Sequence, residues 1–206
     1  MASFNISSFR SNLVGGGARP SLFEVELQFP SALTSQNSSL SQNIITNTPP
    51  QSKFLVKGAS IPGSTIGTYD VFFHGKAIKI AGDRTFETWE TTIINDEGFE
   101  MRHKIEKWME LIQNHTINTR SSELGTTGAE KLEGTNADYK KDISVSQFSK
   151  QGTLLRKYEF IGAFPTTLGA IALDWSTQEL EEFTCTWAYD SWKVSIDSKN
   201  RSKIGV

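Results

Sequence analysis

The residues most able to do chemistry in this sequence of 206 residues are three histidines and a single cysteine. His74, His103 and His115 could bind a metal ion, but no cysteine or pair of carboxylates stands beside them at the spacing that metal ligands need. Cys185 alternates with polar neighbours in a strand-like pattern, where a thiol usually acts as a small buried hydrophobic group. A single cysteine also excludes an internal disulfide. We therefore predict exposed histidines, a buried and unreactive thiol, and no metal site.

Phosphate-binding and nucleophile motifs are missing from the sequence. The glycines at 15–17 are followed by Ala18, Arg19 and Pro20, where a phosphate loop would continue to a lysine and a hydroxyl residue. No Gly-x-Ser-x-Gly segment, the usual setting of a hydrolase serine, occurs. These observations predict that the chain has no catalytic residues and no cofactor, and that it is not an enzyme.

The charge balance excludes a protein whose main task is to grip nucleic acid through a basic surface. The sequence has 21 basic and 23 acidic residues, a net charge of −2 and an isoelectric point near 6.0. Its tryptophans could stack on bases or sugars, but the interleaved basic residues of such sites are missing. We expect these side chains to pack in the core and at interfaces: Trp89, Trp108, Trp175, Trp187 and Trp192.

Alternating apolar and polar residues predict seven or eight short strands. In residues 22–29, for example, four apolar side chains alternate with three polar ones. Strands at 69–73 and 76–80 would form a hairpin around His74 and Gly75, and strands at 143–146 and 153–161 a second one. The other expected strands are residues 53–57, ended by Gly58, residues 86–94 and residues 183–189.

One amphipathic helix is expected after residue 95. Met101, Ile105 and Trp108 recur at spacings of four and three, so they share one face that can cover a sheet. Asn95 or Asp96 would cap the start of this helix.

The chain is expected to fold as a single domain over residues 1–206. Long polar loops at 31–52 and 113–140, an N-terminal arm at 1–21 and a C-terminal tail at 193–206 would flank the regular elements. No apolar run is long enough to span a bilayer, and the first residues do not form a secretory signal. The economical fold is mainly β, an antiparallel β-sandwich or barrel with one packed α-helix.

Residues 79–86 place an acidic and a basic neighbour, Asp83 and Arg84, in what is expected to be a turn between two strands. This segment could be an ordinary surface turn. The same two side chains could also contact another subunit, and both interpretations stay open at this point.

These residues belong to an ordered set of segments that resembles the tail tube proteins of contractile-tailed bacteriophages. The resemblance covers about residues 18–192, and the set as a whole is far more specific than any one segment. The matching segments are Ala-Arg-Pro-Ser-Leu-Phe at 18–23, Lys-Gly-Ala-Ser-Ile-Pro-Gly at 57–63, Ala-Gly-Asp-Arg-Thr-Phe at 81–86 with Trp89, Asn-Asp-Glu at 95–97, Lys-Trp at 107–108, Ala-Asp-Tyr-Lys-Lys at 137–141, Gly-Ala-Phe-Pro-Thr at 162–166, Leu-Asp-Trp at 173–175 and Ala-Tyr-Asp-Ser-Trp at 188–192.

The resemblance implies a structural subunit of the virion. Such subunits form hexameric rings that stack into a hollow tube inside the contractile sheath, with strands of all six copies lining the channel. It also implies assembly in the bacterial cytoplasm with a sheath protein, a baseplate initiator, a tape-measure protein in the lumen and a tail terminator, followed by passage of double-stranded DNA. The candidate residues for subunit and ring contacts are Arg19, Pro20, Asp83 and Arg84.

A channel that conducts DNA should not hold it, so the near-neutral charge leads us to expect a neutral or acidic lumen. Two other functions remain open from the sequence. One is a tube subunit of a related contractile injection or type VI-like secretion system, which would deliver proteins. The other, from a different class, is a monomeric β-barrel that binds a small ligand.

Overall fold

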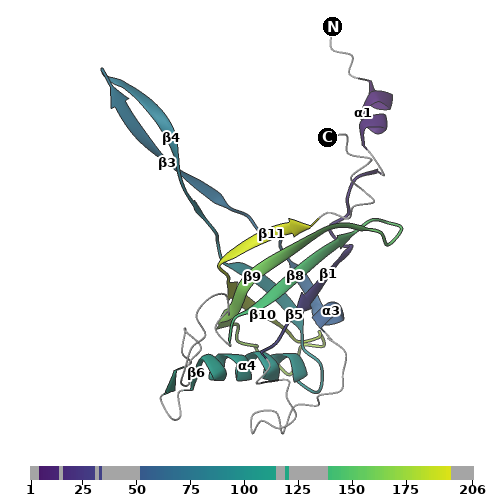
Figure 1. Ribbon diagram of the computed structural model, residues 1–206. Helices are drawn as coiled ribbons and strands as arrows, with labels where there is room; N and C mark the ends of the chain where they lie inside the picture. Colours follow the sequence, from purple (N-terminus) through teal and green to yellow (C-terminus); the bar gives the residue numbers. More distant parts are fainter. Residues whose placement is uncertain are drawn as a thin grey trace.

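The computed structural model describes residues 5–13, 16–30, 33, 52–114, 119–120 and 139–195 (Figure 1). The helices and strands are α1 (Ile6–Asn12), β1 (Phe23–Leu27), α3 (Ser52–Leu55), β2 (Val56–Ala59), β3 (Thr65–Phe73), β4 (Lys76–Thr85), β5 (Trp89–Ile94), α4 (Glu100–Ile112), β6 (Gln113–Asn114), β7 (Thr119–Arg120), β8 (Lys141–Phe148), β9 (Leu154–Leu168), β10 (Glu182–Ala188) and β11 (Ser191–Ser195).

The long strand β9 organises the fold, because its two halves belong to two different sheet surfaces. Its first half pairs with β8 on one side and β11 on the other, and β1 continues beyond β8; we call these four strands the β8 sheet. Its second half pairs with β10, followed by β5 and β2; we call this the β5 sheet. All these pairs are antiparallel. The predicted antiparallel β-sandwich with a packed helix is therefore confirmed.

The core lies between the two sheets and under α4. Alternation along β1 and β8 places Val25 opposite Val145 and Leu27 opposite Ile143, all buried. The helix adds Met101, Ile105 and Trp108 from one face, as its spacing predicts, and each is fully buried. Burying a side chain of this size stabilises the fold by about 1.5–3 kcal/mol. The tryptophans Trp89, Trp108 and Trp187 are buried, which confirms their predicted packing role.

The helix α4 begins later than its predicted caps. Its N-cap position is Phe99, in a left-handed conformation with φ of 53°, and no Phe99 side-chain group caps the helix. Asp96 still contributes, because its Oδ1 accepts a hydrogen bond from the Glu100 amide at 3.2 Å. Asn95 instead lies just after the preceding strand, where its backbone N–H donates to the Glu181 backbone carbonyl.

Three predicted boundaries are wrong. The segment 53–57 was expected to be a strand, but residues 52–55 form the helical turn α3, because so short an apolar run does not distinguish a strand from a helix. The strand β2 then runs through Gly58 to Ala59 with a register shift. Asp83 and Arg84, expected in a turn, lie inside β4. Gly82 allows the strand to continue there, because the Gly67 carbonyl oxygen of β3 lies only 3.2 Å from where a Cβ at position 82 would stand.

The C-terminal tail is also shorter than predicted. Residues 193–195 belong to β11, which pairs with the first half of β9. The rest of the tail, His115, and most of the predicted loops at 31–52 and 113–140 lie outside the described residues.

Candidate assembly surfaces

The residue types that could do chemistry are not gathered into a reaction site. Cys185 is fully buried, and burial raises the pKa of its thiol to about 12, so it is neither exposed nor activated. His74 lies in the hairpin turn and His103 on α4. In the part of the chain that the structure describes, no group of three or more potential ligands could hold a metal ion. No helix of the described residues is long and apolar enough to cross a membrane.

The β8 sheet ends in two strands that each have a neighbour on one side only. Among the described residues, β1 pairs only with β8, and β11 pairs only with β9. Each of these edge strands therefore has one side that faces no further strand among the described residues. Such edges are available for pairing with another chain.

The outward face of the β8 sheet is polar. Alternation places serines and charged residues on this face, and two lysines lie beside Glu159: Lys157 at 3.6 Å and Lys193 at 3.1 Å. Lys53 reaches the face from α3 and pairs with Glu24 at 2.6 Å, a contact that raises the pKa of Lys53. The face includes Glu24, Glu26, Asp142, Ser144, Ser146, Lys157, Glu159, Ile161, Ser191, Lys193 and Ser195. Its four carboxylates and two lysines give a net charge of −2, or −1 if Lys53 is included.

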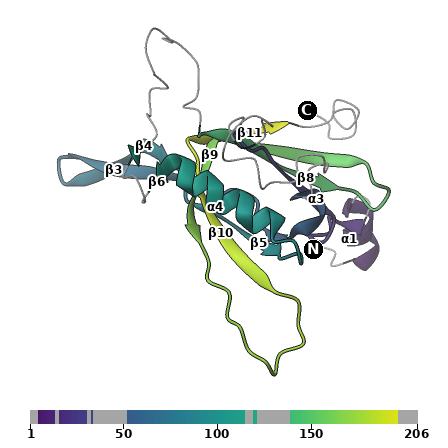
Figure 2. The same ribbon diagram turned by 90° about the horizontal axis from the view of Figure 1, so that it is seen from below.

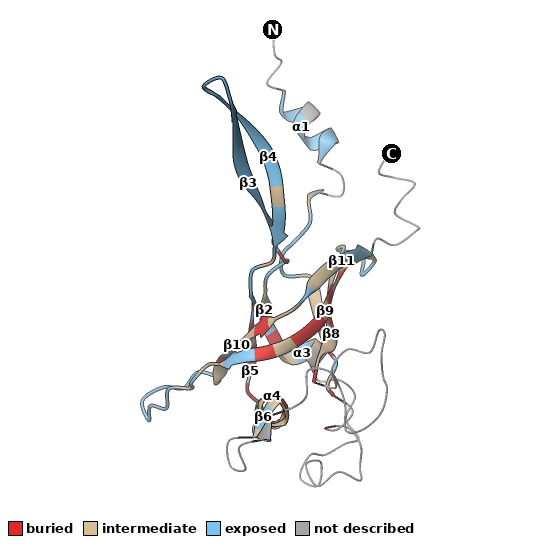
Figure 3. Ribbon diagram, turned by 60° about the vertical axis from the view of Figure 1, so that its left-hand side comes forward, coloured by how far each residue is buried: buried red, intermediate tan, exposed pale blue. Residues whose placement is uncertain are grey.

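The strands β3 and β4 form a hairpin that projects from the body and is exposed along its length (Figures 1 and 3). At its tip, His74 and Gly75 both have positive φ, 46° and 81°, as a tight type I′ turn requires. Cross-strand pairing joins Tyr69 to Ile80 and Val71 to Ile78, so that one face of the ribbon is apolar. We call these four residues the hairpin apolar face. They are between 40% and 54% exposed although their pattern is that of a buried face.

Arg84, one of the predicted contact residues, fixes the base of this hairpin within the subunit. Its guanidinium carbon lies 5.3 Å from the centre of the Phe86 ring and 5.1 Å from that of Trp192 on β11. Its Nη2 donates a hydrogen bond to the Ser64 hydroxyl at 2.8 Å. The Trp192 indole in turn donates to the Gly63 carbonyl at 3.2 Å. These contacts tie the hairpin base to the β8 sheet.

The other predicted contact residues are exposed but lie on different elements. Asp83 is next to Arg84 on β4. Arg19 and Pro20 lie between α1 and β1, and Arg19 lines a cavity of about 260 Å³ with residues at the tip of the β8–β9 hairpin. The fold thus distributes the four candidates over two separate regions of the surface.

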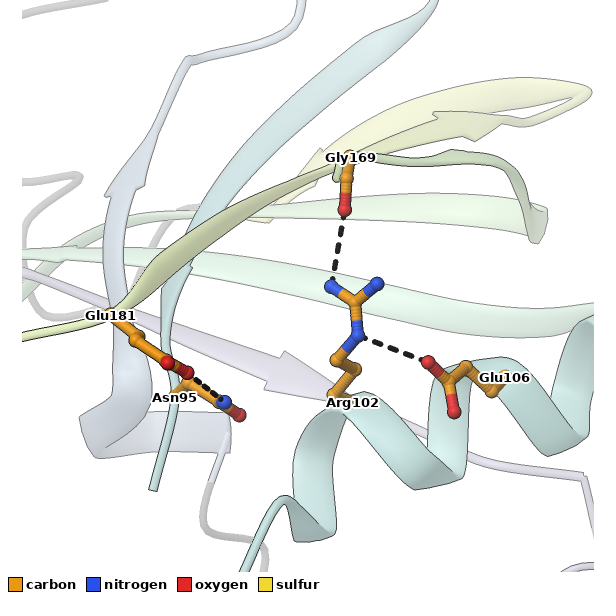
Figure 4. A network of polar contacts seen from close by, with 5 residues as sticks. All are labelled: Asn95, Arg102, Glu106, Gly169 and Glu181. Carbon is orange, nitrogen blue, oxygen red and sulfur yellow. Dashed lines mark hydrogen bonds and ion pairs between the residues drawn. The ribbon is translucent and has the colours of Figure 1, made fainter. Parts of the chain in front are cut away.

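Sequence reasoning missed the segment that joins β9 to β10, residues 169–181, which we call the β9–β10 loop. Arg102 of α4 donates to the Gly169 carbonyl at 3.1 Å and is itself held by Glu106 at 3.0 Å (Figure 4). The other end of the loop is fixed where the Asn95 side chain donates to Glu181 at 2.9 Å. Gly169 is required at its position, because a Cβ would stand 2.5 Å from the Thr184 hydroxyl.

The tip of the β9–β10 loop has its own ordered turn. Asp174 accepts hydrogen bonds from the Ser176 amide at 2.9 Å and hydroxyl at 2.8 Å, and these bonds lower the pKa of its carboxyl. The turn presents Trp175, which is completely exposed, between the exposed side chains of Leu173 and Leu180. The sequence signal was present as Leu-Asp-Trp-Ser, since an Asp two residues before a Ser is typical of such turns.

Together, the fold and these surfaces define a β-sandwich subunit distinguished by its two edge strands, β1 and β11, and by projecting segments. Residues 18–195 match the family described as phage tail tube protein. The chain belongs to this family, and it is a structural subunit of a phage tail tube and thus a component of the virion. The family is structural, which confirms the prediction that the chain is not an enzyme.

Individual relatives agree with this assignment. The chain is 31% identical to tail tube protein gp19 of Enterobacteria phage T4 over 181 residues, which cover 87% of this chain and 93% of the relative. It is 23% identical to the tail tube protein of Serratia phage KSP90 over 188 residues, 89% of this chain and 93% of the relative.

Solved structures show the same fold at lower identity. The cap that terminates the anti-feeding prophage tube is similar with a TM-score of 0.57 and 18% identity, over 87% of this chain and 91% of that one. A chain of the PVC sheath–tube complex, from an extracellular contractile injection system, is similar with a TM-score of 0.54 and 17% identity, over 94% of this chain and 99% of that one.

Proposed function

We propose that six copies of this chain join edge to edge, β1 of one to β11 of the next, and that the resulting rings stack into a tube that conducts double-stranded DNA. The observation that carries this proposal is the β8 sheet, which has four strands and, among the described residues, no further strand beyond β1 or β11. Six such sheets would give about 24 strands, and at about 4.8 Å per strand their circumference is about 115 Å. With strand tilt, the backbone diameter is about 37–45 Å, which leaves room for a duplex.

Edge pairing would turn the polar face of each β8 sheet toward the channel, because the opposite face packs in the core. A ring would then carry a charge between −6 and −12 on its inner wall, from −1 to −2 for each copy. Such a wall repels the DNA phosphates and adds no affinity from counterion release. This supports the expectation of a neutral or acidic lumen.

The wider partners follow from the family and remain part of the proposal. They are the sheath protein around the tube, the baseplate initiator, the tape-measure protein in the lumen and the terminator. The solved relatives with this fold include a tube cap and a sheath–tube complex, which supports contacts of the same kinds here.

Arg19, Pro20 and Asp83 are proposed to contact neighbouring subunits directly, since all three are exposed. Arg84 would act in such contacts through the hairpin base that it holds. Replacing Asp83 by Lys should leave the subunit folded and impair ring stacking, and an unchanged yield of tubes would reject a contact role for this residue.

Proline substitutions in β11 test the edge pairing. Neighbouring residues of an edge strand direct their N–H groups alternately toward the sheet and away from it, so either Lys193 or Val194 points its N–H outward. We expect one of Lys193→Pro and Val194→Pro to keep the melting temperature of the wild type and to form no rings in negative-stain electron microscopy. The matched control, Lys193→Ala, should still form rings.

Two results would count against the proposal. Folded proline variants that both form normal rings would exclude β11 as the joining edge. Wild-type protein that stays monomeric at high concentration, even with a baseplate initiator, would favour the small ligand-binding barrel.

The lumen charge has a separate test. Replacing Glu26 and Glu159 by Lys would change each copy by +4 and make the inner wall positive. Assembled tubes of this variant should bind duplex DNA with a steep salt dependence, whereas wild-type tubes should bind none at moderate salt. Tight binding by wild-type tubes would contradict the proposed wall.

A further inference from the structure

We propose that the β9–β10 loop of one copy docks, through Trp175, on the hairpin apolar face of a copy in the adjacent ring. This inference rests on the proposed stacking of rings and names the two surfaces that make the contact.

The loop is prepared for binding before any partner arrives. Both of its ends are held by the hydrogen bonds of Arg102 and Asn95 (Figure 4). The turn at Asp174 fixes its tip. Little conformational entropy remains to be lost when Trp175 docks, and this is what makes an ordered loop a good binding element. Tryptophan is also the residue type most enriched among side chains that dominate interface energies.

The hairpin apolar face has complementary chemistry. Its four side chains would cover the indole ring and the flanking Leu173 and Leu180. The loop carries three acidic residues, Asp174, Glu179 and Glu181, and no basic one. The hairpin has a net charge of +1, and alternation places Lys76 near the tip on the same face as these four residues. Opposite charges around an apolar centre are the usual arrangement of a specific interface.

The two surfaces lie on different parts of the subunit, as a contact between two copies requires. Figure 3 shows the hairpin rising from the body, while the loop projects sideways beside β10, β5 and α4, and Figure 2 shows that the two segments point in different directions. A contact between two different surfaces of a subunit is heterologous, and it repeats as an open stack where the arrangement of the copies does not close. Such a contact can extend a tube ring by ring.

Single variants test each side of the contact. Trp175→Ala should leave the melting temperature and ring formation unchanged, because the side chain is completely exposed. We expect the concentration needed for rings to stack to rise at least tenfold. Ile78→Asp, on the hairpin, should have the same effect. Phe54→Ala is the matched control, because this exposed aromatic residue lies on α3, outside both surfaces.

Mixing the two variants makes the test specific. A ring of Trp175→Ala subunits keeps the wild-type hairpin apolar face, and a ring of Ile78→Asp subunits keeps the wild-type β9–β10 loop. Rings of the two kinds, assembled separately and then mixed, should form pairs of rings but no long tubes, while each kind alone stays as single rings.

The outcomes separate this inference from the proposed function. If the wild type forms tubes and Trp175→Ala forms tubes of the same length, the loop contact is overturned, while the proposed formation of rings still stands. A mixture without paired rings would overturn the pairing of these two surfaces. A wild-type protein that forms no rings at all would instead refute the proposed function.

Discussion

Replacing Arg84 by Lys should loosen the base of the β3–β4 hairpin while the body stays folded. Arg84 stacks on Phe86 and Trp192 at 5.3 and 5.1 Å and donates a hydrogen bond to Ser64. An exposed cation–π contact contributes about 0.5–1 kcal/mol, and a hydrogen bond about 1 kcal/mol. Lysine keeps the charge but cannot stack as a plane or keep the same donor geometry. We therefore expect a loss of about 1–2 kcal/mol in the local opening free energy of the hairpin, which is about a 5- to 30-fold shift in its opening equilibrium.

Hydrogen exchange measured by NMR separates this local effect from global unfolding. Amides of β3 and β4 should exchange about 5- to 30-fold faster in Arg84→Lys, and amides of β8 and β9 at the wild-type rate. Lys79→Met is the control, because it removes only the exposed pair with Asp70 farther along the hairpin; its effect should be under about twofold. Equal exchange in Arg84→Lys and the wild type would refute the role assigned to the three contacts.

Three further predictions concern two core residues, Cys185 and Trp108, and Gly162 in β9. Burial raises the folded-state pKa of the Cys185 thiol from 9.0 to about 12, so the contribution of the buried neutral thiol to folding stability is complete below pH 9 and is lost as the pH rises toward 12. A thiol reagent at pH 8 should therefore label only unfolded protein. Rapid labelling of the native protein would contradict this. Trp108→Phe should cost about 1–3 kcal/mol in urea unfolding, because the Tyr139 carbonyl loses its buried indole donor at 2.7 Å, and a cost below about 0.5 kcal/mol would show that the bond is replaced. Gly162→Ala should lower the free energy of unfolding in urea by about 1–3 kcal/mol, because φ is 67° and the new Cβ would stand 2.4 Å from an Asp190 oxygen. The control is Gly63→Ala, where nothing lies within 4 Å of the new Cβ, and it should change the free energy of unfolding by less than about 0.5 kcal/mol.

Much of the core could be predicted from the sequence, because burial there follows from local periodicity. Val25 and Leu27 alternate with glutamates on β1, and Ile105 and Trp108 share a helix face, so each assignment needs only neighbouring residues. The buried Cys185 follows from the same alternation.

The surfaces proposed to contact other subunits could not be predicted in the same way, since they depend on which segments become neighbours in the fold. Strand β11 is short and polar, and only its pairing with β9 makes it an edge. The role of Arg84 is a similar case. As a charged residue in an expected turn it indicated an external contact, whereas the fold places it against Phe86 and Trp192. The β9–β10 loop has no period at all, and its order comes from Arg102 and Asn95, which lie far away in the sequence.

In the hairpin, periodicity and burial disagree, and this disagreement bears on function. Tyr69, Val71, Ile78 and Ile80 follow the pattern of a buried strand face, yet each is at least 40% exposed. A two-stranded ribbon is at best marginally stable in water without a surface to cover it. Among the described residues, the body holds this ribbon at its base, through Arg84 and Trp192. The alternation in residues 65–85 therefore supports the proposal that this face becomes buried when subunits assemble. On that proposal, the sequence encodes the packing of the tube as well as that of the single subunit.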